Sequence, residues 1–295
     1  MKFVILTTNR LKEKRIFETK KIYRSALKRG IETYFVHPND LVYFISNNEI
    51  KIFYKKVDLT DTDVVLVRRV TEAENKAYEM LSAFKKLHTL IVSDNQMNPF
   101  PSQKIIQQLK KINLFPKSIY FTKEQKECVL KVIIKQIGFP FVLKPNNGVG
   151  GQFVCKIENE KDFLKYFKNN EYSEFIAQEV LDAEAEYRVF VINGESLGAC
   201  EKISDNFTKN ACKGSKFIYR RVKDIEKVAI RYAKVFGAEI AGVDVVRTKK
   251  NEIKLLEINY CPGFIAFTKA SKIKIEDKII DYCLEKYKKD KKVIV

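Results

Sequence analysis

Two apolar strands near the end of the chain, within AGVDVVRTKKNEIKLLEINYCPG, carry acidic and amide residues inside their hydrophobic runs. A two-residue turn at Lys250-Asn251 would pair them as an antiparallel hairpin, with Asp244 directly opposite Glu257. Because side chains alternate along a strand, Asn259 lies on the same face as Glu257. Two facing carboxylates repel each other, and a divalent cation relieves that repulsion. The pattern therefore predicts a magnesium site with Asp244, Glu257 and Asn259 as its ligands.

The same pattern has a simpler explanation, a hairpin whose polar face is only solvated. The spacing alone favours neither interpretation. The exit sequence Cys261-Pro262-Gly263-Phe264 favours the metal site, because a rigid turn fixes the end of a strand that must hold ligands.

The first 95 residues predict an N-terminal α/β domain. The runs KFVILTT, ETYFVHP, DVVLVRR and TLIVSD have the composition of buried strands, with helical segments after the first and third. VYFI and IKIFY flank Ser46-Asn47-Asn48 and predict a small hairpin. Strand–helix–strand order favours a parallel, doubly wound sheet. The segment NQMNPFPSQ, residues 95–103, marks the end of this domain.

Strands dominate the remainder of the chain. A helix beginning near Ser102 is predicted first, with an apolar side formed by Ile105, Ile106, Leu109 and Ile112. Further helices are predicted at about 124–137, 224–236 and 276–288. Strands are predicted at FPFVLK, QFVCKI, EFIAQEV, YRVFVI, SLGACEKI, AGVDVVRT and IKLLEIN. Asn193-Gly194 is a strong signal for a tight hairpin turn.

The segment FPFVLKPNNGVGGQF indicates phosphate binding. It places Lys144 at the end of a strand and follows it with Gly148, Gly150 and Gly151. Glycine-rich turns let backbone amides approach phosphate oxygens, and a lysine adds a point charge. The loop matches neither a Walker A sequence nor a dinucleotide-binding fingerprint, since it leads into a strand. A hairpin tip with no ligand is the alternative.

The segment EFIAQEVLDAEAEYRVF supplies further candidate nucleotide contacts. The strand end at Glu179 and Val180 can offer its backbone to an adenine edge, and Glu186 can accept ribose hydroxyls. A solvated loop carboxylate is the alternative for Glu186. Arg188 lies among apolar neighbours and needs an anionic partner, either a substrate group or a structural carboxylate.

The composition limits the class of protein. No run of eighteen apolar residues occurs, which excludes a transmembrane helix. The sequence contains no CxxC pair, so a zinc knuckle is not predicted. The N-terminus lacks the features of a signal peptide, so a cytoplasmic location is expected. The formal net charge of +18 is explained either by a general excess of lysine or by an anionic partner such as nucleotide, acidic peptide or RNA.

The order of these motifs resembles the ATP-grasp superfamily, and more narrowly its RimK-like glutamate ligases, over essentially the whole chain. The resemblance implies a mixed α/β and α+β fold with a doubly wound pre-ATP-grasp domain at residues 1–95. A lid subdomain at 96–182 and a metal-binding C-terminal subdomain at 183–295 would enclose ATP. It further implies ATP with Mg²⁺ (or Mn²⁺) as cofactors. The expected partners are an acidic amino acid or peptide substrate and a second copy of the chain in a homo-oligomer. No membrane association is expected. Nucleic-acid or ribosome association stays open.

The resemblance also implies roles for individual residues. By this resemblance, Lys104 and Lys144 would contact phosphates. The nucleotide and acyl-phosphate region would be lined by Thr208, Lys209 and Asn210. Arg188, Lys202 and Asn210 would act on the reacting groups. The sequence departs from the family pattern at Val149, Phe153 and Lys202, where a hydroxyl residue, glycine and arginine are usual.

We therefore expect a ligase that activates a carboxylate as an acyl phosphate and joins it to an amine, adding glutamate or another amino acid to a protein tail or small molecule. A ligase of cofactor or amino-acid biosynthesis, a nucleotide-binding protein without catalysis, and a basic RNA-binding protein are the alternatives.

Overall fold

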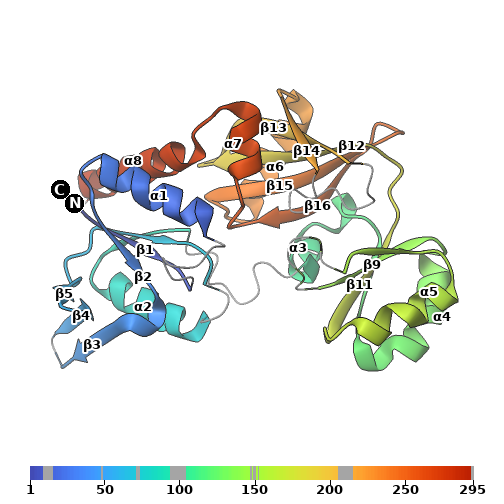
Figure 1. Cartoon of the computed structure of the whole chain (residues 1–295), viewed down its shortest axis with the longest axis horizontal. Coiled ribbons are helices and arrows are strands. Elements are labelled where there is room, and N and C mark those ends of the chain that lie inside the picture. Colours follow the sequence, from blue (N-terminus) through green and yellow to red (C-terminus); the bar gives the residue numbers. More distant parts are fainter. Residues whose placement is uncertain are drawn as a thin grey trace.

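The computed structural model describes residues 1–8, 16–47, 49–70, 74–93, 104–146, 148, 151, 153–204 and 215–293. Three sheets with their helices form the body of the molecule, and a small three-stranded sheet extends from the N-terminal one (Figure 1). This is the predicted combination of an α/β N-terminal part with α+β parts. Of the helices described, none is both long and apolar enough to cross a membrane.

The N-terminal sheet is parallel, with strand order β2-β1-β6-β7. Helices cover both faces: α1 packs on the face of Phe3 and Ile5, and α2 on the face of Val4 and Leu6. The predicted doubly wound arrangement is confirmed. The elements are β1 (Lys2–Leu6), α1 (Phe17–Lys28), β2 (Glu32–Val36), β6 (Val64–Val67), α2 (Glu74–Lys86) and β7 (Leu90–Val92).

The predicted hairpin after β2 is present. Strands β3 (Leu41–Ile45) and β4 (Ile50–Tyr54) pair in antiparallel fashion, and β5 (Val57–Asp58) adds a third strand. This sheet packs through Ile52 onto the α2 side of the N-terminal core.

The central sheet has strand order β10-β9-β11-β8 and is antiparallel. Its core is rich in phenylalanine from strands and helices, including Phe121, Phe141 and Phe163. Strand β8 was not predicted, and β10 is shorter than the predicted QFVCKI. The elements are β8 (Ser118–Thr122), α4 (Lys126–Gln136), β9 (Phe141–Pro145), β10 (Cys155–Ile157), α5 (Glu160–Tyr166) and β11 (Glu174–Glu179).

The C-terminal sheet is antiparallel, with order β14-β13-β12-β15-β16. Helix α6 covers one face, while α7 and α8 cover the other together with the N-terminal sheet (Figure 1). The turn between β12 and β13 has positive φ at Asn193 and Gly194, as the Asn-Gly signal predicted. The elements are β12 (Ala183–Ile192), β13 (Glu195–Ile203), β14 (Lys216–Arg220), α6 (Lys223–Val235), β15 (Ile240–Thr248), β16 (Ile253–Asn259), α7 (Ile265–Ser271) and α8 (Ile275–Val293).

Helix α3 (Lys104–Lys110) lies between the central sheet and β16, and its predicted apolar side is wrong. The structure buries Gln107 and Gln108 and leaves Leu109 65% exposed. The reason is that α3 packs beside the edge strand β16, whose free backbone groups need polar partners. A short 3₁₀ turn at Ile112–Leu114 follows α3, and others occur at Pro38–Asp40, Lys123–Gln125 and Phe167–Asn169.

Candidate active site

The hairpin of β15 and β16 places Asp244 directly opposite Glu257, as predicted. The predicted turn, however, is wrong by one residue. Thr248 pairs with Glu252 around a three-residue turn, in which Asn251 has a φ of 59°. A β-bulge between the Asp244 and Val245 pairs then shifts the register back. The two irregularities compensate, so the carboxylates face each other although the turn is longer.

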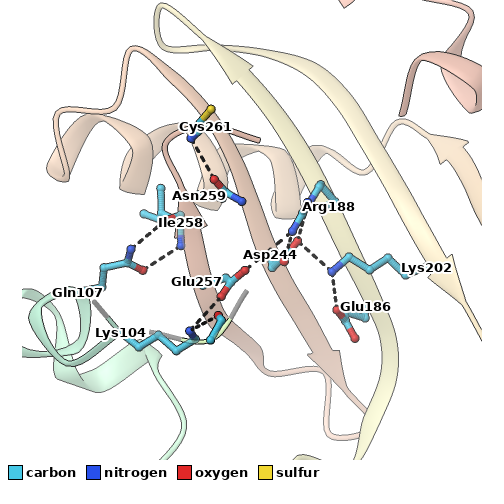
Figure 2. A network of polar contacts seen from close by, with 11 residues as sticks. Lys104, Gln107, Glu186, Arg188, Lys202, Asp244, Glu257, Ile258, Asn259 and Cys261 are labelled. Carbon is cyan, nitrogen blue, oxygen red and sulfur yellow. Dashed lines mark hydrogen bonds and ion pairs between the residues drawn. The ribbon is translucent and has the colours of Figure 1, made fainter. Parts of the chain in front are cut away.

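Asp244 is the centre of a buried network of charges (Figure 2). Arg188, opposite it on β12, donates from Nε to Oδ1 at 2.8 Å and from Nη2 to Oδ2 at 2.5 Å. Lys202 on β13 lies 3.0 Å from Asp244 Oδ1 and 2.6 Å from Glu186 Oε1. The Asp244 and Lys202 side chains are 5% and 2% exposed, so this network is almost free of solvent.

The network fixes the charge state of Asp244. Burial alone would raise the pKa of this carboxyl, but the adjacent Arg188 and Lys202 outweigh it and lower the pKa to about 2. Burial alone would lower the pKa of Arg188. The carboxylates of Asp244, Glu257 and Glu186 outweigh this effect, so the pKa of Arg188 is raised. Asp244 is therefore ionised across the physiological pH range.

Glu257 is held far less tightly. Its side chain is 34% exposed, and its nearest cations are Lys104 Nζ at 3.9 Å and Arg188 Nη2 at 4.0 Å. Asn259, two residues further along β16, accepts a hydrogen bond from the backbone N–H of Cys261 at 2.9 Å through Oδ1. An amide oxygen has a second lone pair, so this bond leaves Asn259 able to accept again.

Two lysines approach from the other side. Lys104 on α3 donates from Nζ to the carbonyls of Asn146 at 3.1 Å and Gly148 at 3.4 Å. Lys144 on β9 donates to Gln178 Oε1 at 2.8 Å. Burial and the nearby charge of Lys104 lower the pKa of Lys144 to about 8, against the opposing effect of Glu257 and Glu186. Lys104, Lys144 and Glu257 are thus brought into one electrostatic environment.

The remaining predicted residues fall in three groups. Glu179 ends β11, and its carboxylate accepts from the Lys117 backbone N–H at 2.8 Å, with Val180 next in the chain. Gly148 lies close against Pro145, and Gly151 has a φ of 69°. Outside the described residues lie Gly150, Thr208, Lys209 and Asn210, together with Ser102 and Val149.

Gln107 is a site residue that sequence reasoning missed. Its amide donates to the Ile258 carbonyl at 2.8 Å and accepts from the Ile258 N–H at 2.9 Å, as a neighbouring strand would (Figure 2). Ile258 lies between Glu257 and Asn259, and Gln107 is one turn from Lys104. This clamp fixes α3 against the candidate ligands. The adjacent glutamines in an otherwise apolar helix were the available signal.

The donor set fits magnesium. Mg²⁺ in proteins uses one or two carboxylates and completes its coordination with water and substrate phosphates. Asp244 and Glu257 supply two facing carboxylates, and Asn259 supplies a neutral oxygen. Over the described ranges, no group of three or more His, Cys, Asp or Glu side chains is placed to hold a metal ion. A site of this composition needs phosphate oxygens as further ligands, as expected for a metal bound together with a nucleotide.

The comparisons with known proteins define the class. Residues 98–283 match the RimK-like ATP-grasp domain, and residues 1–96 match the RimK pre-ATP-grasp domain. The chain therefore belongs to the RimK-like ATP-grasp family. Its fold is the ATP-grasp fold with an N-terminal pre-ATP-grasp domain, and it is a ligase that uses ATP to form C–N bonds.

Curated relatives are named as glutamate ligases. A probable alpha-L-glutamate ligase of Haemophilus influenzae is 29% identical over 290 residues, covering 92% of this chain and 94% of the relative. A tetrahydromethanopterin:alpha-L-glutamate ligase of Methanocaldococcus jannaschii is 29% identical over 156 residues, 49% of this chain and 53% of the relative. These similarities place the chain among carboxylate–amine ligases.

Solved structures share the fold at low sequence identity. The ATP-grasp ligase PsnB, complexed with a phosphomimetic variant of a minimal precursor, Mg and ADP, has a TM-score of 0.71 at 14% identity. The similarity covers 97% of this chain and 98% of PsnB. D-cycloserine synthetase DcsG has a TM-score of 0.68, also at 14% identity, with 97% and 100% coverage. Binding of ATP with Mg²⁺ follows from the family and fold.

Proposed function

We propose that the protein joins the amine of L-glutamate to a carboxylate on a peptide tail or a small molecule. The observation that carries this proposal is the row of charges on the C-terminal sheet. The carboxylates of Asp244 and Glu257 face each other. Arg188 and Lys202 lie on one side of this pair, and Lys104 lies on the other. Such a row suits a reaction in which phosphate and carboxylate charges meet.

In the proposed reaction, an oxygen of the acceptor carboxylate attacks the γ-phosphorus of ATP, and the bond to the leaving ADP breaks. The resulting acyl phosphate is attacked at carbon by the glutamate amine, which loses a proton, and inorganic phosphate leaves. Lys104 and Lys144 hold the transferring phosphoryl group by charge. Arg188 and Lys202 balance the charge at the acyl phosphate, and Asn210 is proposed beside them.

The proposed metal ligands are Asp244, Glu257 and Asn259. Magnesium bound there supplies charge neutralisation for phosphate oxygens, and manganese is proposed as a substitute. Glu179 and Val180, at the end of β11, are proposed to hold adenine, and Glu186 to hold ribose. The loop glycines and Thr208, Lys209 and Asn210 complete the proposed nucleotide contacts.

Two acceptor classes follow from the comparisons. PsnB was solved with a precursor peptide, which supports a peptide acceptor. The archaeal relative is named for tetrahydromethanopterin, which supports a small-molecule acceptor. The domain boundaries at 95 and 182, the homo-oligomer, nucleic-acid or ribosome association and the cytoplasmic location stay predictions.

The test is ADP release from ATP–Mg²⁺ with L-glutamate and either acidic peptides or small carboxylic acids, followed by mass analysis. We expect ADP release that requires both glutamate and an acceptor, with products heavier by one or more glutamyl residues. The control is the same mixture with glutamine in place of glutamate. ADP release that ignores the amino acid and gives no heavier product would contradict the proposal.

A further inference from the structure

Arg68, directly after β6, is a buried cation that has no anionic partner among the described residues. It is the largest of the described side chains that are less than 2% exposed. Its Nη2 donates to the carbonyl of Pro262 at 3.3 Å, whereas Nε and Nη1 are buried with no hydrogen-bond partner. Within the described ranges, Arg68 forms no ion pair with a carboxylate.

This arrangement is unfavourable in the absence of a ligand. A guanidinium remains charged in proteins and carries five N–H donors. Burying such a group without a counter-charge is strongly destabilising, and one long bond to a carbonyl offsets little of that. Two other buried cations near the site, Arg188 and Lys202, each have a carboxylate partner in the structure. Arg68 therefore has the properties of a group whose partner arrives from outside the chain.

The position of Arg68 in the sheet is one where ligands bind. It follows a central strand of a parallel sheet, at the carboxyl end. In the order β2-β1-β6-β7 the connections diverge between β1 and β6, and such a switch point forms a crevice. By strand alternation, Arg68 continues the face of Val64 and Leu66, which packs toward the C-terminal sheet.

Arg68 is also close to the candidate active site. Its acceptor, Pro262, follows Asn259 by three residues. At Gly242 on β15, an added Cβ would lie 2.7 Å from Pro262 Cβ and 3.6 Å from Arg188 Cδ. The Pro262 turn is thus the layer between Arg68 and the Arg188–Asp244 pair. A ligand at Arg68 would enter from the N-terminal domain, while Lys104 and Lys144 come from α3 and the central sheet.

We propose that Arg68 binds a carboxylate of one of the two substrates that the ligase joins. A carboxylate can accept from the unpartnered Nε or Nη1 together with an N–H of Nη2, because a bidentate pair uses two donors on one edge of the guanidinium. The phosphates of ATP already have Lys104 and Lys144 on another element, which favours a carboxylate over a phosphate at Arg68. The inference rests on the proposed function for the identity of the ligand. Its source is either the amino acid or the acceptor acid, and the experiment separates them.

The experiment compares the full chain with Arg68→Met and Arg69→Met. Arg69 is the matched control, since it is the adjacent arginine on the same strand end and is exposed. The melting temperature of each protein is measured without ligand and then with L-glutamate, with an acetylated glutamyl peptide, or with glutarate. We expect the carboxylate to raise the melting temperature of the wild type and of Arg69→Met. It should leave the melting temperature of Arg68→Met unchanged. If only glutamate raises the melting temperature, the ligand of Arg68 is the amino acid. If only the acetylated peptide raises it, the ligand is the acceptor acid.

Ligand-free stability separates binding from a structural role. Because Arg68 has no anionic partner, Arg68→Met should melt at the same or a higher temperature than the wild type. In turnover, the KM for the substrate that gave the shift should rise about tenfold or more, with the KM for ATP unchanged. A lower ligand-free melting temperature with unchanged carboxylate binding would overturn the inference, as would a wild-type protein that responds to none of the three carboxylates.

The proposed function can fail separately. If the wild type forms product and Arg68→Met binds that substrate equally well, the Arg68 inference fails and the ligase proposal stands. If no product forms but a carboxylate shift is lost in Arg68→Met, the glutamate-ligase proposal fails and the Arg68 site stands.

Discussion

The charged residues of the candidate site form two groups that differ in how completely they are paired. The inner group on β12, β13 and β15 consists of Glu186, Arg188, Lys202 and Asp244, joined by contacts of 2.5–3.0 Å. The outer group consists of Lys104, Lys144 and Glu257. Its lysines contact carbonyl or amide oxygens, and its carboxylate is 3.9 Å or more from any cation that pairs with it.

The difference indicates a division of roles. Buried charges that are paired within the protein hold one geometry and contribute to the fold as well as to chemistry. Charges that are paired loosely retain capacity for a ligand. We therefore interpret the inner group as a fixed framework that holds Asp244 in place as a proposed metal ligand, and the outer group as the part that adjusts when phosphate and metal bind. The following predictions test this comparison.

The largest expected effect is on stability, for Asp244→Asn in the inner group. This change leaves Lys202 with Glu186 and leaves Arg188 only with Glu257 at 4.0 Å, so we expect the free energy of unfolding to fall by about 3–5 kcal/mol. Urea denaturation measures it. The control is Asp182→Asn, which breaks an exposed pair with Lys249 and should change stability by less than about 1 kcal/mol. A loss in Asp244→Asn no larger than in this control would show that the inner group is not a structural framework.

The next effect is on turnover, for Glu257→Gln in the outer group. Loss of one proposed metal ligand should lower the rate of ADP release about 100-fold or more, because even indirect partners of a bound metal contribute 10–100-fold. Stability should stay within about 0.5 kcal/mol, since the side chain is partly exposed and weakly paired. Glu252→Gln, on the same hairpin but 59% exposed, is the matched control. Normal ligation by Glu257→Gln would remove Glu257 from the metal site.

The smallest effect is a pH dependence from Lys144. With its pKa near 8 in the free protein, Lys144 loses its charge as the pH rises above about 8, so kcat/KM for ATP should fall about tenfold per pH unit there. In Lys144→Arg that decline should disappear, because a guanidinium stays charged. The unfolded lysine keeps its proton to a higher pH, so the ligand-free protein should gain stability from this group as the pH rises past 8. Identical pH profiles for the two proteins would exclude Lys144 as the titrating group.

Local sequence patterns were enough to predict most of the fold. The buried strands of the N-terminal domain, the Asn193-Gly194 turn and the helix before Gly237 are all present. Strands β8 and β14 were missed, since their sequences lack a clear alternation and their pairing partners lie far away in the chain. Helix α3 was predicted with the wrong face, because its burial depends on the edge of β16.

The candidate metal hairpin was predicted for a reason that was only partly correct. The two-residue turn gave the right pairing of Asp244 with Glu257, but the structure reaches it through a longer turn and a bulge. Strand alternation constrains the face of a residue strongly, whereas the exact turn is set by local backbone conformation at Asn251. The pairing was therefore more robust than the turn from which it was inferred.

The sequence by itself determined most of the strands and helices and that Asp244, Glu257 and Asn259 share a hairpin, because periodicity and turn residues act over short distances. Only the tertiary structure decided that Arg188 and Lys202 enclose Asp244, that Gln107 holds β16, and that Arg68 is buried beside Pro262. These contacts join segments 42 to 194 residues apart, or they depend on which side of a helix is buried. Packing between whole elements sets such contacts, and no local pattern encodes them.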